Sequence, residues 1–117
     1  MTIIRVIAKK IGNSSIEICE PRLRNYMNKL TQIAMKQPGY VGSNSYWEFT
    51  DNHNTKYNGK IQNIYTISDW NSQYSWDLWL NSQERKVIQN EYKDVIKTEE
   101  FNLLYVNKYK EDSTFLL

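Results

Sequence analysis

The chain has 117 residues, a length that suits one domain with a modest hydrophobic core. Its 24% charged and 40% hydrophobic residues are typical of a globular protein and exclude an intrinsically disordered one. A net charge of +2 with no long run of Lys or Arg argues against a nucleic-acid partner, and no apolar stretch is long enough to span a membrane. Because Cys19 is the only cysteine and the apolar start of the chain is too short for a signal peptide, we expect a cytoplasmic protein.

The first two expected elements are a strand and a helix. Residues 2–11 are rich in β-branched side chains and carry apolar residues on both faces, which predicts a strand covered on both sides. Residues 20–37 repeat apolar residues at the spacing of one helical face, and Pro38-Gly39 should end that helix.

A hairpin pattern follows, with strands predicted over residues 40–50 and 61–70. Strict alternation places Tyr40 and Ser43 on opposite faces of the first of these strands. The polar segment 51–60 between them should form a long loop, and it contains His53.

The last part of the chain predicts two helical segments and a strand. Trp76 and Trp79 share a face of the first segment, which should break at Asn81-Ser82. The second segment is expected to run to about Lys97, and residues 100–109 predict the final strand.

This βαββαβ order predicts an α+β, ferredoxin-like fold in a single domain over residues 1–117, with a core of about 2–109 and a tail of 110–117. Both helical regions should cover one face of a four-stranded antiparallel sheet, because crossovers are right-handed. Strands with apolar residues on both faces would leave the other sheet face exposed in a monomer. We therefore expect a homodimer that packs sheet against sheet.

The element order, Pro38-Gly39, the aromatic second strand and the segment WNSQYSWDLWLNS together resemble the antibiotic biosynthesis monooxygenase family of the dimeric α+β barrel superfamily. The resemblance covers residues 2–109. It implies a dimeric α+β barrel with a substrate pocket between the sheet and the helices. The family includes oxygenases that oxidise quinols and phenols without metal or flavin, and also haem-degrading monooxygenases.

The haem-degrading branch makes demands that this sequence does not meet. That branch ligates iron through a histidine after the helix tryptophan, and Gln89 stands in that place. It also has an asparagine on the first strand, where Ile7, Ala8 and Lys9 stand here. We therefore expect no haem degradation by the family's scheme, no cofactor, and no bound metal, since one histidine and one cysteine do not make a usual zinc site.

The tryptophans support two interpretations, because large aromatic side chains build cores as well as pockets. Trp70 and Trp79 match the functional tryptophans of the family and should lie near a substrate pocket, whereas Trp76 should lie toward the core. Further candidate substrate contacts are Asn44, Gln89 and Tyr92.

Candidate catalytic residues are harder to select. An oxygenase without a cofactor needs a base, or a cation that stabilises the substrate anion. Arg5 interrupts an apolar strand, His53 titrates near neutral pH, and Tyr65 lies on the third strand, so these three are the candidates. Each also has an ordinary structural interpretation: an ion pair, a solvated loop residue, or a packed tyrosine.

Three functions stay open at this point. The first is a cofactor-independent monooxygenase acting on a small aromatic or quinol-like substrate. The second is a non-catalytic ligand-binding or stress-response member of the same superfamily, and the third is a haem-binding protein without the usual histidine ligand. An open cavity with a polar residue favours the first function, and a cavity filled by tryptophans favours the second.

Overall fold

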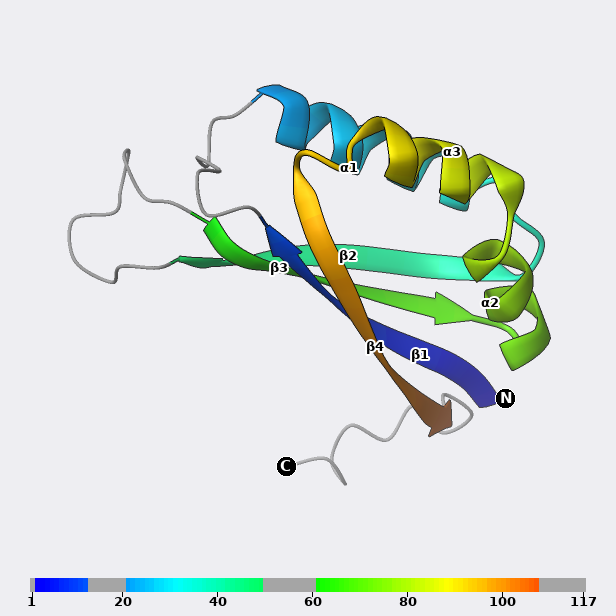
Figure 1. Ribbon diagram of the computed structural model, residues 1–117. Coiled ribbons are helices and arrows are strands. Elements are labelled where there is room, and N and C mark those ends of the chain that lie inside the picture. The colour runs from blue at the N-terminus through cyan, green and yellow to red at the C-terminus, as the bar shows by residue number, and fades with distance from the viewer. Residues whose placement is uncertain (1, 13–20, 50–60, 108–117) are drawn as a thin grey trace.

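The computed structural model describes residues 2–12, 21–49 and 61–107, and all statements below concern these residues. Four strands form one antiparallel sheet in the order β2-β3-β1-β4 (Figure 1). The strands are β1 (Thr2–Gly12), β2 (Tyr40–Phe49), β3 (Ile61–Trp70) and β4 (Ile96–Asn107). The helices are α1 (Pro21–Ala34), α2 (Gln73–Leu80) and α3 (Gln83–Glu91).

The helices α1 and α3 lie side by side over one face of the sheet, and α2 sits at the end where β3 finishes (Figure 1). This is the predicted ferredoxin-like α+β fold, which the structure confirms. None of the described helices has the length and apolar character that a membrane crossing requires.

The end of the second helical region differs from the prediction. We expected the helix to run to about Lys97, but α3 ends at Glu91 and β4 begins at Ile96. A turn lies between them, in which the Val95 amide donates to the Tyr92 carbonyl. Tyr92 and Val95 are buried in this turn, so their apolar spacing reflects core packing in a turn and not a longer helix.

The strand β2 contains a bulge that reverses the predicted faces at its start. Tyr40 pairs with Trp70 while Gly42 pairs with Asp69, so Val41 is the extra residue. Tyr40 therefore shares the helix-facing side with Ser43, and their hydroxyl oxygens lie 2.7 Å apart. Strict alternation had placed these two side chains on opposite faces.

The turn before β2 requires glycine. Gly39 adopts a φ of 84°, a conformation that residues with a Cβ rarely adopt. Its carbonyl accepts a hydrogen bond from the Asn71 amide at 2.8 Å. A Cβ at this position would collide with the side chains of Ser75 and Asn71. The predicted Pro38-Gly39 signal thus marks the place where the entry to β2 packs against the start of α2.

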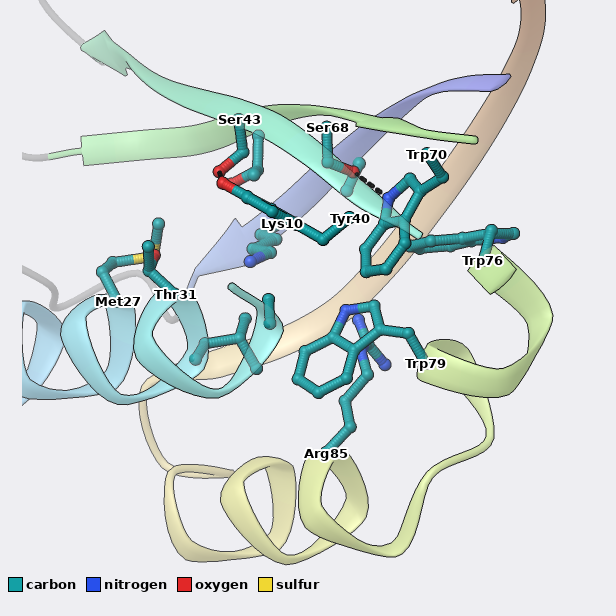
Figure 2. A pocket seen from close by; sticks show the side chains of 14 residues that line it. Lys10, Met27, Thr31, Tyr40, Ser43, Ser68, Trp70, Trp76, Trp79 and Arg85 are labelled. Carbon is teal, nitrogen blue, oxygen red and sulfur yellow. Dashed lines mark hydrogen bonds between the residues drawn. The ribbon is translucent and has the colours of Figure 1, made fainter. Parts of the chain in front are cut away.

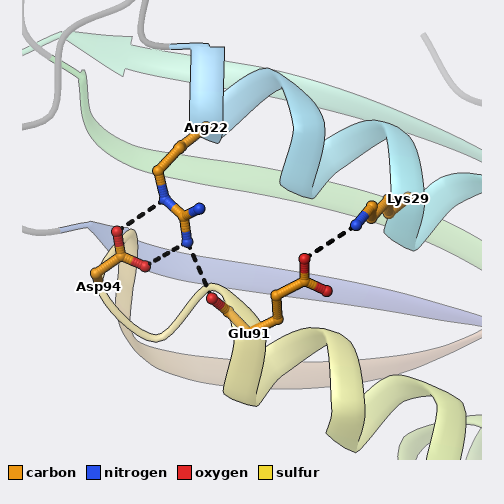
Figure 3. Close-up of polar contacts among 4 residues, drawn as sticks. All are labelled: Arg22, Lys29, Glu91 and Asp94. Carbon is orange, nitrogen blue, oxygen red and sulfur yellow. Dashed lines mark hydrogen bonds and ion pairs between the residues drawn. The ribbon is translucent and has the colours of Figure 1, made fainter.

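Four exposed side chains connect α1 to the end of α3 and to the turn before β4 (Figure 3). Arg22 binds both carboxylate oxygens of Asp94, at 2.9 and 2.7 Å, and also the carbonyl of Glu91 at 2.9 Å. The Lys29 ammonium donates to the Glu91 carboxylate at 3.0 Å. The hydrogen bond from Arg22 lowers the pKa of Asp94. Exposed ion pairs add little stability individually, so their main effect is to position α1 relative to α3.

The sheet face opposite the helices carries the expected apolar residues of β1, β3 and β4, and polar pairs lie among them. Arg5 forms a two-pronged ion pair with Asp69, at 2.8 and 2.9 Å. Asn63 donates to Glu48 on the same face. Apolar residues such as Ile7 and Ile67 lie between these polar pairs.

Candidate functional site

A cavity of about 40 Å³ lies between the helices and the helix-facing side of the sheet (Figure 2). We call it the tryptophan cavity. It is lined by Ala8, Lys10, Met27, Leu30, Thr31, Ala34, Tyr40, Ser43, Thr66, Ser68, Trp70, Trp76, Trp79 and Arg85. The lining residues that are not fully buried all belong to α1, β2 or β3, so the cavity opens on that side.

All three tryptophans of the segment 70–79 line this cavity and also belong to the buried core. Trp70 is fully buried, and its ring lies 5.9 Å from Trp76 in an edge contact and 6.4 Å from Trp79 in a nearly parallel stack. Trp76 continues the cluster to Phe101 at 5.4 Å. The structure therefore does not separate a core tryptophan from two pocket tryptophans, because each side chain packs on its neighbours and presents an edge to the cavity.

Local structure explains how the tryptophans come together. Trp70 ends β3 on the helix-facing side, opposite Ile4, and its indole Nε1 donates to the Ser68 hydroxyl at 2.9 Å. The hydroxyl of Ser72 accepts from the Ser75 amide and so begins α2. Trp76 and Trp79 are three residues apart on that helix, so both point back toward Trp70.

Lys10 is the most unusual residue at the cavity. It follows Ile4, Val6 and Ala8 on the helix-facing side of β1, and it is 2% exposed. Its ammonium lies 5.2 Å from the centre of the Tyr26 ring. Burial lowers the pKa of Lys10 to about 8, although the nearby Glu99 carboxylate acts in the opposite direction.

A buried ion pair lies next to Lys10. Glu99 is the cross-strand partner of Lys10 on β4, and it accepts from Arg85 at 3.0 and 3.2 Å. The side chains of Arg85 and Glu99 are only 4% and 8% exposed. Gln89 also donates to Glu99. The Arg85 guanidinium lies beside the rings of Trp79 and Phe101, at 5.9 and 5.5 Å from their centres.

Behind this ion pair is a second cavity of about 220 Å³, which we call the Tyr26 cavity. It is lined by Tyr26, Gln89, Tyr92, Lys93, Ile96, Lys97, Thr98 and Glu99. Two predicted substrate contacts, Gln89 and Tyr92, therefore lie here and not at the tryptophan cavity. Tyr92 packs on Tyr26 with ring centres 5.6 Å apart, and burial raises the pKa of the Tyr26 hydroxyl.

Three other predicted site residues lie on the opposite face of the sheet. Arg5 and Asn44 border a shallow depression of about 380 Å³. Tyr65 donates a long hydrogen bond of 3.4 Å to Glu48. The structure does not bring these residues together with the tryptophans, and His53 falls in the segment 50–60, outside the described residues.

The sequence analysis did not select Lys10, Arg85 or Glu99. For Lys10 a signal existed, because it continues the alternating apolar face of Ile4, Val6 and Ala8 and so had to be buried. Arg85 precedes the buried Ile88 by three residues, which places it on the same inward face of α3. The pairing of Lys10 with Glu99 depends on the β1–β4 register, and that of Arg85 with Glu99 on how α3 packs over β4, neither of which the sequence alone gives.

Together these groups provide flat aromatic walls beside two buried cations. Aromatic rings suit a planar ligand, and a cation near such a wall can bind an anion or exchange a proton with an acidic group. The site therefore has the chemistry for binding and ionising a small aromatic molecule.

No protein-family model matches the chain, and no curated protein matches it either. Several solved structures, however, match the chain over most of its length. PA3566 from Pseudomonas aeruginosa superimposes with a TM-score of 0.66 at 13% identity, covering 92% of this chain and 96% of that one. SnoaB from Streptomyces nogalater, a cofactor-independent oxygenase, gives 0.65 at 10% identity over 92% and 96% of the two chains. A dimeric ferredoxin-like protein of unknown function from Thermobifida fusca gives 0.64 at 9% identity over 90% and 92%. At such low identities the similarity establishes what the strand order had indicated: the chain has the ferredoxin-like α+β fold of these proteins over nearly its whole length.

Proposed function

We propose that the protein is a cofactor-independent monooxygenase that acts on a small aromatic, quinol-like substrate in the tryptophan cavity. The observation that carries this proposal is the buried Lys10 at an aromatic cavity between sheet and helices. SnoaB, a cofactor-independent oxygenase, shares the fold and so supports the proposal. Reactions of this kind need an aromatic wall, a proton acceptor and a charge that stabilises the substrate anion.

Lys10 supplies both the proton acceptor and the charge that stabilises the substrate anion. Because its pKa is about 8, roughly a tenth of the side chain is neutral at pH 7 and able to accept a proton. Taking the proton from a phenol or enol leaves the anion next to the newly formed ammonium. That anion reacts with O₂ directly: at a ring methylene, one oxygen atom becomes the carbonyl oxygen and the other leaves as water with the two hydrogens. The balance needs no external reductant.

The size of the cavity limits what enters without movement. Engineered cavities of about 150 Å³ bind benzene, whereas the tryptophan cavity measures about 40 Å³. A substrate ring therefore requires the rim to move. Met27 and Thr31 form the α1 side of that rim, and methionine adapts readily to new contacts.

We further propose that two copies pack through the sheet face opposite the helices. That face exposes the apolar residues Tyr46 and Leu104. The depression beside Arg5 offers a place for side chains of a second copy. The dimeric protein from Thermobifida fusca has the same fold and supports this assembly.

The second candidate function is non-catalytic binding of a small ligand. The close packing of Trp70 with Trp76 and Trp79 favours it, because the tryptophans fill most of the space that a large substrate would need. Such a protein would bind an aromatic molecule in the rim without consuming O₂.

Oxygen uptake with a panel of quinols and enolisable ring compounds tests the proposal. We expect uptake that Lys10→Met abolishes and that Lys36→Met leaves unchanged, because Lys36 is exposed and does not line the cavity. If Lys10→Met retains the wild-type rate, Lys10 is not the base. Binding without uptake for every compound would favour the second candidate function.

A further inference from the structure

The charges around the tryptophan cavity do not balance. Lys10, Arg85 and Glu99 are all buried and adjacent, and Gln89, the fourth member of this cluster, is neutral. Tyr26, the ring that faces Lys10 from α1, is also neutral because its pKa is raised. With Lys10 protonated, the cluster has two positive charges and one negative charge. Buried charges in proteins are normally paired, so one unit of positive charge lacks a partner among the described residues.

Arg85 also has a hydrogen-bond donor to spare. Its Nη2 binds both oxygens of Glu99, but its Nε is buried and meets no acceptor among the described residues. An unsatisfied buried donor is destabilising, by about 1–3 kcal/mol in typical cases. Lys10 and Arg85 both line the tryptophan cavity, so the unbalanced positive charge and the unsatisfied Arg85 donor lie at the same site.

From these features we infer that the tryptophan cavity binds a flat monoanion, such as an aromatic carboxylate or a phenol or enol acidic enough to be ionised in solution. The inference deepens the proposed function and rests on it for the location of the site. It adds that the buried cations also hold ligands that are ionised before they enter, and that they select such ligands against neutral molecules of the same shape that have no acidic proton.

The geometry indicates how such a ligand is oriented in the cavity. Its charged group belongs next to Lys10 and Arg85, at the closed end of the cavity. Its ring belongs between Trp79 and the rim formed by Met27 and Thr31 (Figure 2). The present volume of about 40 Å³ is far below the roughly 150 Å³ of cavities that bind benzene, so the ring requires the rim to move.

The test is a comparison of benzoate with benzamide, its neutral analogue of the same shape. Binding is followed by NMR through the indole N–H signals of the tryptophans. Trp70, Trp76 and Trp79 line the cavity, while Trp47 lies outside it, beside Met27 at the rim. Neither compound has the phenol, enol or ring methylene that the proposed oxygenation needs, so the measurement is independent of oxygenase activity.

We expect benzoate to bind at least about tenfold more tightly than benzamide at a pH below 7, which corresponds to one favourable charge interaction. Lys10→Met should remove this preference, and Lys36→Met should leave it intact. The benzoate affinity should also fall as the pH rises through the pKa of Lys10, because the neutral amine no longer attracts the anion.

Equal affinities for the two compounds, or no shift of the cavity tryptophans with benzoate, would overturn the inference. An equal loss in Lys10→Met and Lys36→Met would also overturn it, because the effect would then be a general surface attraction. Anion binding without any O₂ uptake would refute the monooxygenase but keep the inference. O₂ uptake with a neutral quinol, together with equal affinities for benzoate and benzamide, would support the monooxygenase and refute the inference.

Discussion

Replacing Lys10 by methionine should make the protein more stable at neutral pH. The two side chains are similar in length, and methionine carries no charge into the core. The displacement of the Lys10 pKa from 10.5 to about 8 corresponds to roughly 3 kcal/mol of unfavourable free energy for the buried ammonium. Lys10 is almost fully buried, so solvent does not screen this penalty, and we expect Lys10→Met to raise the free energy of unfolding by about 1–3 kcal/mol at pH 7.

The pH dependence provides the stronger test of this reasoning. Below pH 8 Lys10 is protonated in both states, so the folded wild type bears the full penalty. Between pH 8 and 10.5 the unfolded chain keeps a proton that the folded chain has released, so the contribution of Lys10 to stability rises with pH. The advantage of the variant should therefore be largest near pH 7 and should shrink toward pH 10.5.

Urea unfolding followed by tryptophan fluorescence measures both curves, because the cavity tryptophans become exposed on unfolding. Lys36→Met is the matched control, since it removes the same charge from an exposed position. A stability difference between wild type and Lys10→Met that stays constant with pH, or a variant that is less stable at pH 7, would refute the assignment of Lys10 as a buried, strained cation.

Other variants test other parts of the structure. Trp70→Ala should lower the free energy of unfolding by about 3–5 kcal/mol, measured by urea unfolding, because the whole ring is buried among aromatic neighbours. Arg85→Met should lower the free energy of unfolding by about 1–3 kcal/mol, because Glu99 loses its hydrogen bonds from Arg85 while Lys10 still balances its charge, and the double variant with Glu99→Met should lose less than the sum of the two single variants; additive losses would show that the pair does not interact. Gly39→Ala should lower the melting temperature through its positive φ, whereas an unchanged melting temperature would contradict the described turn. Tyr46→Glu should convert a dimer of about twice 14.0 kDa into monomer in sedimentation experiments; a wild type that is already monomeric would refute the proposed assembly.

The fold was predictable from the sequence because its signals are local. The periodicity of α1, the Pro38-Gly39 turn and the serine that caps α2 each act over a few residues, and the structure contains all three. The bulge at Val41 was not predictable in this way, because it depends on how β2 pairs with β3. Its effect is to turn the Tyr40 hydroxyl toward the cavity, which strict alternation would have turned away.

The candidate site was predictable only in part, for a related reason. The tryptophans were found because they are close in sequence and lie on one strand end and one short helix. The cluster of Lys10, Arg85 and Glu99 joins β1, α3 and β4, so it exists only through the register of distant segments. Arg5 and Tyr65 were selected as polar residues on strands, but a strand has two faces, and theirs is the face away from the helices.

The uneven attachment of α1 determines how the tryptophan cavity can open. The polar contacts of Arg22 and Lys29 fix the edge of α1 that faces α3, and Met27 and Thr31 lie at the cavity mouth on the side of β2. The displacement that keeps these polar contacts is therefore a rotation of α1 about its α3 edge. Such a rotation admits a ring past the mouth while the end at Lys10 stays closed to water. A ligand would lose its hydration shell at the mouth first and meet the buried charges afterwards, so the desolvation step comes before recognition.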